Sequence, residues 1–294
     1  MGIYKTWTDE QDNYLRNNYS NKKASLLAEE LHKTKISIKN RLKKLGLLLT
    51  VEEKKKRYSL RVQKFNVNHE FFSNPKDENL FTSAYLLGYL WADGYINKKL
   101  KKQHNKVSLC IVTEDSNDIE NLFLQSGEWR FRNEIPKTGK PLTTIMSHSK
   151  NLHCFLEQMD FKIKSQTSPY KILHGKQTEY IRGFWRGCLD GDGCYHFNPD
   201  PKIRKKCISL SGTKNQDWTC YTNFLKSLEI DFKIREDSGS SVIIYKAKSI
   251  VNLIDFIYPN EKYDLIGLKR KFYKAKEIKK YIENLMIKNK HYYK

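Results

Sequence analysis

The chain has 294 residues, and at about 150 residues per domain this length favours roughly two domains. It is 39% hydrophobic and 13% aromatic, which is enough for a packed core, and its net charge of +21 predicts a polyanionic partner, with nucleic acid ahead of a membrane surface. With no run of 18 apolar residues we expect no membrane-spanning helix, and with no basic-then-apolar start we expect a cytoplasmic protein with six reduced cysteines.

Residues 1–49 have the pattern of a three-helix unit. Thr8 is placed to cap a first helix with an acidic first turn, and a second helix carries Leu27 on its apolar side. A third helix begins near Thr34 and ends before Gly46. Its polar side is strongly basic, which fits either a DNA-contacting helix or a merely solvated one.

The first helix, led by Trp7, and the basic third helix resemble the Myb/SANT-like class of helix-turn-helix units. In that class the last helix enters the major groove of DNA. On this resemblance, the expected DNA-binding residues of the unit are Lys35, Lys39, Asn40, Arg41 and Lys43.

Residues 50–79 have the composition of a basic linker. The charged run contains Lys54, Lys55, Lys56 and Arg57, and an Asn-, Asp- and Pro-rich stretch follows it. Basic side chains in such a linker are suited to follow phosphates between two DNA-bound domains.

Two similar motifs stand out in the rest of the chain, at residues 86–94 and 185–193. Each predicts a helix that ends in Asp-Gly, and the terminal acids Asp93 and Asp192 are offset by 99 positions. Small residues recur at every fourth position of both helices: Ala84, Gly88 and Ala92 in the first, and Gly183, Gly187 and Gly191 in the second. Each glycine costs a helix about 0.8–1 kcal/mol relative to alanine, so a compensating contact is required.

Residues four apart share one face of a helix, and small residues there allow a second helix to approach closely. We therefore predict that the two helices pack backbone to backbone and bring Asp93 and Asp192 together. Two adjacent carboxylates repel each other unless a proton or a cation lies between them, and oxygen ligands suit Mg²⁺. The alternative is that each Asp-Gly only terminates its helix.

Each motif is followed by the same series of predicted elements. After the first come strands 95–101 and 106–113, helix 115–126, strands 128–135 and 142–147, and helix 149–159. After the second come strands 194–198 and 204–213, helix 215–228, strands 230–236 and 241–246, and helix 249–257. The interpretation is a duplicated unit, with halves at residues 80–177 and 178–262 and a basic C-terminal helix and tail at 263–294.

The two motifs resemble the signature of LAGLIDADG homing endonucleases, in the single-chain form with two copies. The resemblance covers roughly residues 80–260 and implies an α+β fold of two αββαββα halves whose saddle-shaped antiparallel sheets bind DNA. It also implies that Asp93 and Asp192, with Gly94 and Gly193 beside them, hold a divalent metal. Trp91, Arg186 and Cys188 depart from the usual motif, and Asp190 is expected to make local hydrogen bonds rather than to catalyse.

Basic residues that assist the reaction are also implied, and Lys246, late in the second repeat, is the expected one. Alternation predicts that strands 128–135 and 230–236 turn Trp129, Phe131, Ile135, Ile230, Phe232 and Ile234 toward the core. On the opposite face and on strand 204–213, the expected DNA-binding residues are Arg130, Arg132, Lys206, Lys233 and Arg235.

These observations favour a monomeric, intron-encoded or free-standing, site-specific endonuclease. It would cut double-stranded DNA at a long asymmetric target with Mg²⁺, for which Mn²⁺ or Ca²⁺ can substitute in binding. Two alternatives stay open. One is a maturase that binds intron RNA with the same fold, and the other is a regulator that binds DNA without cleaving it.

Overall fold

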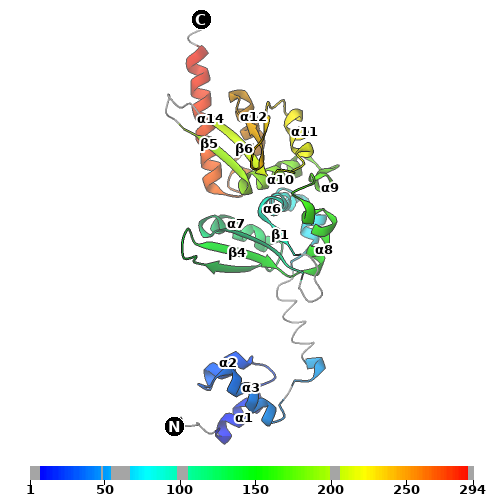
Figure 1. Ribbon diagram of the computed structural model, residues 1–294, viewed down its shortest axis with the longest axis vertical. Coiled ribbons are helices and arrows are strands. Elements are labelled where there is room, and N and C mark those ends of the chain that lie inside the picture. Colours follow the sequence, from blue (N-terminus) through cyan, green and yellow to red (C-terminus); the bar gives the residue numbers. More distant parts are fainter. Residues whose placement is uncertain (1–6, 48, 54–66, 98–104, 199–205, 291–294) are drawn as a thin grey trace. The chain divides into compact units, whose positions relative to one another are not determined.

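The computed structural model describes residues 7–47, 49–53, 67–97, 105–198 and 206–290 (Figure 1). The basic linker residues Lys54, Lys55, Lys56 and Arg57 lie outside these ranges. The chain forms two compact units, Met1–Lys64 and Phe65–Lys294. Within the described ranges, no helix has both the length and the apolar character needed to cross a bilayer.

Residues 9–44 of the first unit form three helices, as predicted: α1 (Asp9–Asn18), α2 (Ala24–Glu30) and α3 (Lys35–Lys44). The side chain of Thr8 accepts a hydrogen bond from the backbone N–H of Gln11, and Thr34 caps α3 in the same way through Ser37. Gly46 has a φ of +71°, the left-handed conformation that commonly ends a helix. Leu15, Leu27, Ala28 and Ile38 form the buried core of the unit.

The second unit contains the same αββαββα series twice, which confirms the predicted fold class. The first half consists of α6 (Leu80–Asp93), β1 (Tyr95–Ile96), β2 (Val107–Val112), α7 (Thr113–Gln125), β3 (Arg130–Glu134), β4 (Leu142–Ser147) and α8 (Lys150–Gln158). The second half consists of α10 (Thr178–Gly191), β5 (Gly193–Phe197), β6 (Lys206–Gly212), α11 (Thr219–Ser227), β7 (Lys233–Glu236), β8 (Ser240–Ile244) and α12 (Ala247–Ile257).

Short elements lead into and connect the halves, and a long helix follows them. They are α5 (Glu70–Ser73), η1 (Asp77–Asn79), η2 (Phe161–Ile163), α9 (Tyr170–Leu173), α13 (Glu261–Asp264) and α14 (Lys269–Lys290).

Each half folds into a four-stranded antiparallel sheet, with the orders β1-β2-β4-β3 and β5-β6-β8-β7. The central pairs are equivalent, because Leu109 faces Ile145 in the first sheet and Ile208 faces Ile244 in the second, each offset by 99 positions. These four side chains are buried, so one face of each sheet belongs to the core. Figure 1 shows α6 and α10 side by side between the two sheets.

The contact between α6 and α10 is made by backbone, as the small residues predict. A Cβ added to Gly88 would lie 1.9 Å from the carbonyl oxygen of Phe184, and one added to Gly187 would lie 2.0 Å from that of Tyr85. No side chain larger than hydrogen fits at either position. The close approach offsets the low helix propensity of these glycines.

The outer strands are shorter than predicted, and two inward assignments are wrong. Ile135 is 88% exposed and Ile234 is 46% exposed, although both were expected to face the core. The reason is that β3 and β7 are edge strands, each paired on one side only, and β3 ends at Glu134 before the hairpin. Ile230 is buried as expected, but it lies before β7 begins at Lys233.

Candidate metal centre and nucleic-acid interface

The structure brings the two motif acids together at the ends of α6 and α10. A Cβ on Gly191, the residue before Asp192, would lie 3.2 Å from Oδ2 of Asp93. After burial, the charge of Asp93 is the next largest cause that raises the pKa of Asp192. Both side chains remain open to solvent. The predicted pairing of carboxylates is therefore present.

The pKa values of both acids are shifted by their surroundings. Partial burial, followed by repulsion from Asp93, raises the pKa of Asp192 to about 6, and burial also raises the pKa of Asp93. Nearby charge from Lys164 and Lys271 lowers both pKa values in part. In the described part of the chain no three His, Cys, Asp or Glu residues cluster as metal ligands, so an ion here would depend on two carboxylates, backbone carbonyls and water.

The glycines after the acids shape the turn from helix to strand. A Cβ on Gly94 would lie 2.3 Å from the carbonyl oxygen of Leu90, and one on Gly193 would lie 2.3 Å from that of Leu189. Both positions therefore require glycine for the chain to leave the helix. The carbonyl oxygen of Gly193 accepts a hydrogen bond from Nζ of Lys271.

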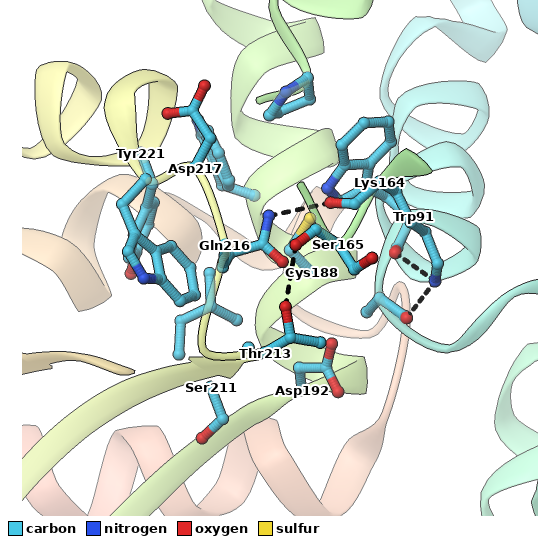
Figure 2. Close-up of a pocket in the computed structure, with 16 residues that line it drawn as sticks. Trp91, Lys164, Ser165, Cys188, Asp192, Ser211, Thr213, Gln216, Asp217 and Tyr221 are labelled. Carbon is cyan, nitrogen blue, oxygen red and sulfur yellow. Dashed lines mark hydrogen bonds between the residues drawn. The ribbon is translucent and has the colours of Figure 1, made fainter. Parts of the chain in front are cut away.

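Two lysines that the sequence analysis missed serve the two motifs in parallel. Nζ of Lys164 donates to the carbonyl oxygen of Trp91 at 2.6 Å and also contacts those of Leu90 and Ala92, at the end of α6 (Figure 2). Nζ of Lys271 donates to the carbonyl oxygen of Leu189 at 3.0 Å, at the end of α10. Each ammonium thus lies at the negative end of a helix, where a cation is stabilised.

The surroundings of these two lysines lower the pKa of each ammonium group. Burial lowers the pKa of Lys164 to about 8, although the charges of Asp192 and Asp93 act in the opposite direction. Burial also lowers the pKa of Lys271. A lysine with such a pKa can take part in proton exchange near neutral pH. Lys164 follows η2 in the run Phe161-Lys162-Ile163-Lys164, and Lys271 lies in the first turn of α14 in the run Leu268-Lys269-Arg270-Lys271.

Lys271 is held in place by contacts to both halves. Arg270 makes a bidentate ion pair with Asp115 on α7, with both N–O distances at 2.7 Å. Lys269 pairs with Asp118 on the same helix at 3.1 Å. The backbone N–H of Leu268 donates to Asp190 at 2.9 Å. We name residues 268–271 the strap, because they join the second half to the first beside the paired acids.

Asp190 makes local hydrogen bonds, as expected. Its carboxylate accepts from the hydroxyl of Tyr85 at 2.9 Å and from Nε of Arg186 at 3.2 Å. The fully buried guanidinium of Arg186 lies 3.7 Å from the ring centre of Tyr258. The unusual arginine of the second motif thus belongs to a buried polar network, where the carboxylate compensates its charge.

Lys246 lies immediately before α12 as its N-cap residue, and its Nζ is 3.2 Å from the carboxylate of Asp231. The lysine charges that act on Asp93 and Asp192 come from Lys164 and Lys271. The sequence gives no periodic signal for these two lysines, because both lie outside the two repeated halves' helices and strands, Lys164 after η2 and Lys271 at the start of α14.

The basic residues predicted on the sheets are mostly exposed. Arg130 and Arg132 lie on edge strand β3, and Lys233 and Arg235 lie on edge strand β7. Two of them have acidic neighbours, since Arg132 pairs with Glu134 at 3.2 Å and Arg235 with Asp237 at 2.5 Å. Lys206 is half-buried, 5.9 Å from the ring centre of Tyr281.

On α3, Lys35, Lys39, Asn40 and Lys43 are exposed. Arg41 differs from them, because Nε donates to Oδ1 of Asp12 at 2.7 Å and the guanidinium lies 5.6 Å from the ring centre of Trp7. This contact joins α1 to α3, so Arg41 supports the fold of the unit.

No family model matches the chain. An uncharacterized protein of Listeria innocua serovar 6a is 31% identical over 106 residues, which are 35% of this chain and 43% of that protein. The match thus covers less than half of that relative's length.

Among solved structures, I-DmoI in complex with DNA and Ca is 15% identical and matches over 67% of this chain and 98% of its own, with a TM-score of 0.46. I-SmaMI bound to uncleaved DNA with calcium ions is 15% identical over 70% and 92%, with a TM-score of 0.47. The N-terminal LAGLIDADG domain of DUF199/WhiA is 15% identical over 66% and 91%, with a TM-score of 0.42. At these low values the similarities assign no activity to the chain.

Proposed function

We propose that this chain is a site-specific double-strand DNA endonuclease of the LAGLIDADG homing type. The observation that carries the proposal is the meeting of Asp93 and Asp192 at the ends of two backbone-packed helices, with a half-buried Lys164 at one helix end and a buried Lys271 at the other. Paired acids with raised pKa values beside ammonium groups are typical of a catalytic centre rather than of two helix stops.

In this proposal Asp93 and Asp192 hold Mg²⁺, and the backbone at Gly94 and Gly193 contributes to the same site. A bound divalent ion supplies an activated water and stabilises the leaving oxygen of a phosphodiester. The oxygen-only donor set and the repulsion between the acids, which Lys164 and Lys271 offset only in part, fit such an ion. Mn²⁺ or Ca²⁺ can replace it in binding.

We assign the basic role in the reaction to Lys164 and Lys271. Their ammonium groups lie close enough to the acids to shift their pKa values, and they can offset the negative charge that develops on a scissile phosphate. Lys164, with a pKa of about 8, can also hold or release a proton at Nζ near neutral pH. Lys246, which pairs with Asp231, is left as a candidate for phosphate contact.

The proposed partner is double-stranded DNA with a long asymmetric target. The exposed arginines and lysines of β3 and β7 are suited to base edges and phosphates, and α3 offers a second basic surface. Because both halves are in one chain and differ in sequence, we propose a monomer that reads two different half-sites. The net charge of +21 predicts strong salt dependence of binding.

A cleavage selection from randomised DNA with Mg²⁺ tests the function and reports the target together. Asp93→Asn and Asp192→Asn should each abolish double-strand cleavage while DNA binding persists, and Asp255→Asn, on the exposed side of α12, serves as the matched control. Full cutting by both single variants would refute the assignment. DNA binding without cleavage under any divalent metal would favour a regulator, and intron splicing that survives both substitutions would favour a maturase.

A further inference from the structure

The two site lysines reach equivalent atoms of the two motif helices from segments that follow each half. Nζ of Lys164 contacts the carbonyl oxygen of Leu90 at 3.4 Å, and Nζ of Lys271 contacts that of Leu189, 99 positions after Leu90, at 3.0 Å. A lysine has a long flexible stem, so its ammonium group stays in one place only if the backbone that carries it is fixed. The contacts that fix this backbone therefore decide where each ammonium group lies.

The segment that carries Lys164 is held by the second half (Figure 2). Nε2 of Gln216 donates to the carbonyl oxygen of Lys164 at 2.9 Å and to that of Thr167 at 3.3 Å. Oγ1 of Thr213 donates to the carbonyl oxygen of Ser165 at 2.8 Å. Both donors lie in the loop between β6 and α11. The lysine that follows the first half is thus attached to the second.

The strap, which carries Lys271, is held by the first half. Asp115 makes the bidentate ion pair with Arg270, and Oδ2 of Asp118 accepts a hydrogen bond from the backbone N–H of Lys269 at 3.0 Å. Asp115 is 6% exposed, and a carboxylate so buried is strongly destabilising without its charged partner. The pair therefore keeps Arg270, and Lys271 next to it, in one position.

These contacts come from equivalent places in the repeat. Thr113 and Thr213 directly follow β2 and β6, and Asp115 and Gln216 come within the next three residues of the chain. We name Asp115 with Asp118 the first brace, and Thr213 with Gln216 the second brace. Their chemistry differs, because carboxylates form the first brace and a hydroxyl and an amide form the second. The same place in each half nevertheless holds the segment that follows the opposite half.

We propose that the braces position the site lysines across the two halves: the second brace fixes the lysine at the end of α6, and the first brace fixes the lysine at the end of α10. The inference rests on the proposed function for what the lysines do, and on the hydrogen bonds above for how they are held. A misplacement of about 1 Å at a reacting group can cost about 100-fold in rate. Each half therefore depends on the other for the position of its lysine.

Hydrogen exchange of the full chain in EDTA tests the positioning independently of cleavage. Mass spectrometry follows peptides that cover residues 163–168 and 268–272. Gln216→Ala should speed exchange in the first peptide about 3- to 10-fold, because loss of a hydrogen bond shifts a local opening equilibrium by about this factor, and should leave the second peptide unchanged. Asp115→Asn should speed exchange in the second peptide and leave the first unchanged.

Matched variants separate the braces from their surroundings. Asn215→Ala changes an exposed residue beside Gln216, and Asp255→Asn removes a different ion pair to α14, at Lys279. Neither should alter exchange in either peptide. Thr213→Val removes the hydroxyl of the second brace and Thr213→Ser keeps it, so only the valine variant should speed exchange in residues 163–168.

Single-turnover cleavage with Mg²⁺ shows which lysine each brace serves. Gln216→Ala should lower the rate of the wild type about 10- to 100-fold, have no further effect in a Lys164→Met chain, and keep its effect in a Lys271→Met chain. Asp115→Asn should lose its effect in the Lys271→Met chain and keep it in the Lys164→Met chain. A general structural defect would instead slow cleavage equally in every background.

Exchange that rises equally in both peptides, or in neither, would overturn the proposal, as would a Gln216→Ala effect of the same size in both lysine variants. A chain that cuts DNA while the brace variants leave exchange unchanged rejects the braces and leaves the nuclease proposal standing. A chain that shows the expected exchange pattern but cuts no DNA with any divalent metal keeps the positioning across the halves and rejects the nuclease.

Discussion

Replacement of Gly187 by alanine should break the contact between α6 and α10. The new Cβ would lie 2.0 Å from the carbonyl oxygen of Tyr85 and 2.6 Å from the backbone nitrogen of Tyr89. Both neighbours are backbone atoms, so no rotamer change relieves the clash. The helices must separate by roughly 1 Å, and a gap of 0.5–1 Å already removes a quarter to a half of the dispersion energy between the atoms it parts.

The magnitude follows from two opposing effects. Alanine gains about 1 kcal/mol of helix propensity over glycine, and overpacking of a close contact costs about 1–3 kcal/mol, or more where backbone must move. Because the whole contact between α6 and α10 opens, we expect the free energy of unfolding to fall by about 2 kcal/mol. In a unit of this size that lowers the melting temperature by about 4–8 °C. Gly88→Ala, with a contact of 1.9 Å to Phe184, should behave in the same way.

Thermal unfolding followed by circular dichroism measures the effect, with cleavage as a second readout because the acids move apart with the helices. Gly239→Ala is the matched control, since its Cβ would meet a single atom at 3.1 Å, the carbonyl oxygen of Gly212. If Gly187→Ala and Gly88→Ala melt no lower than Gly239→Ala, the two helices are not in backbone contact and the reasoning fails.

Three further predictions concern the acids, the lysines and the first unit. In EDTA, Asp192→Asn should stabilise the protein, because the pKa of the native Asp192 is raised from 3.8 to about 6 and the stability of the wild type therefore falls as pH rises through this window. The gain in the free energy of unfolding, about 1 kcal/mol after allowance for solvent exposure, should be full above pH 6 and absent near pH 4. Urea unfolding at both pH values measures it. Lys164→Met should lower the rate of cleavage at least about 100-fold, with Lys162→Met as control, and a rate within threefold of wild type would exclude Lys164 from the reaction. Arg41→Ala should destabilise the N-terminal three-helix unit by about 1–3 kcal/mol because it leaves Asp12 unpaired. Lys39→Ala should lower only the affinity for DNA. Equal melting temperatures of the two variants would contradict the structural role of Arg41.

The features carried by local pattern could be predicted from the sequence. The stripes around Gly88 and Gly187 specify the helix contact, and the 99-residue offset places Asp93 beside Asp192. Strand alternation located the central strands well, because β2, β4, β6 and β8 are paired on both sides. It failed at Ile135, where an edge strand ends and no partner fixes the pattern.

The lysines of the site could not be predicted in the same way. Lys164 and Lys271 lie in irregular segments or at the start of a helix, and their role depends on which helix end the folded chain brings beside them. Arg41 shows the converse case. Its place on a basic helix suggests DNA contact, and its ion pair with Asp12 appears only when α1 and α3 are packed together.

The strap has a consequence for exchanging halves between chains of this fold. Lys269 and Arg270 begin α14, which follows the second half, and their partners Asp115 and Asp118 belong to the first. A chimera that imports a foreign first half without these two acids would leave Lys271 poorly anchored, although the second half and α14 are intact. Recombination of specificities should therefore transfer α7 together with the segment that begins α14.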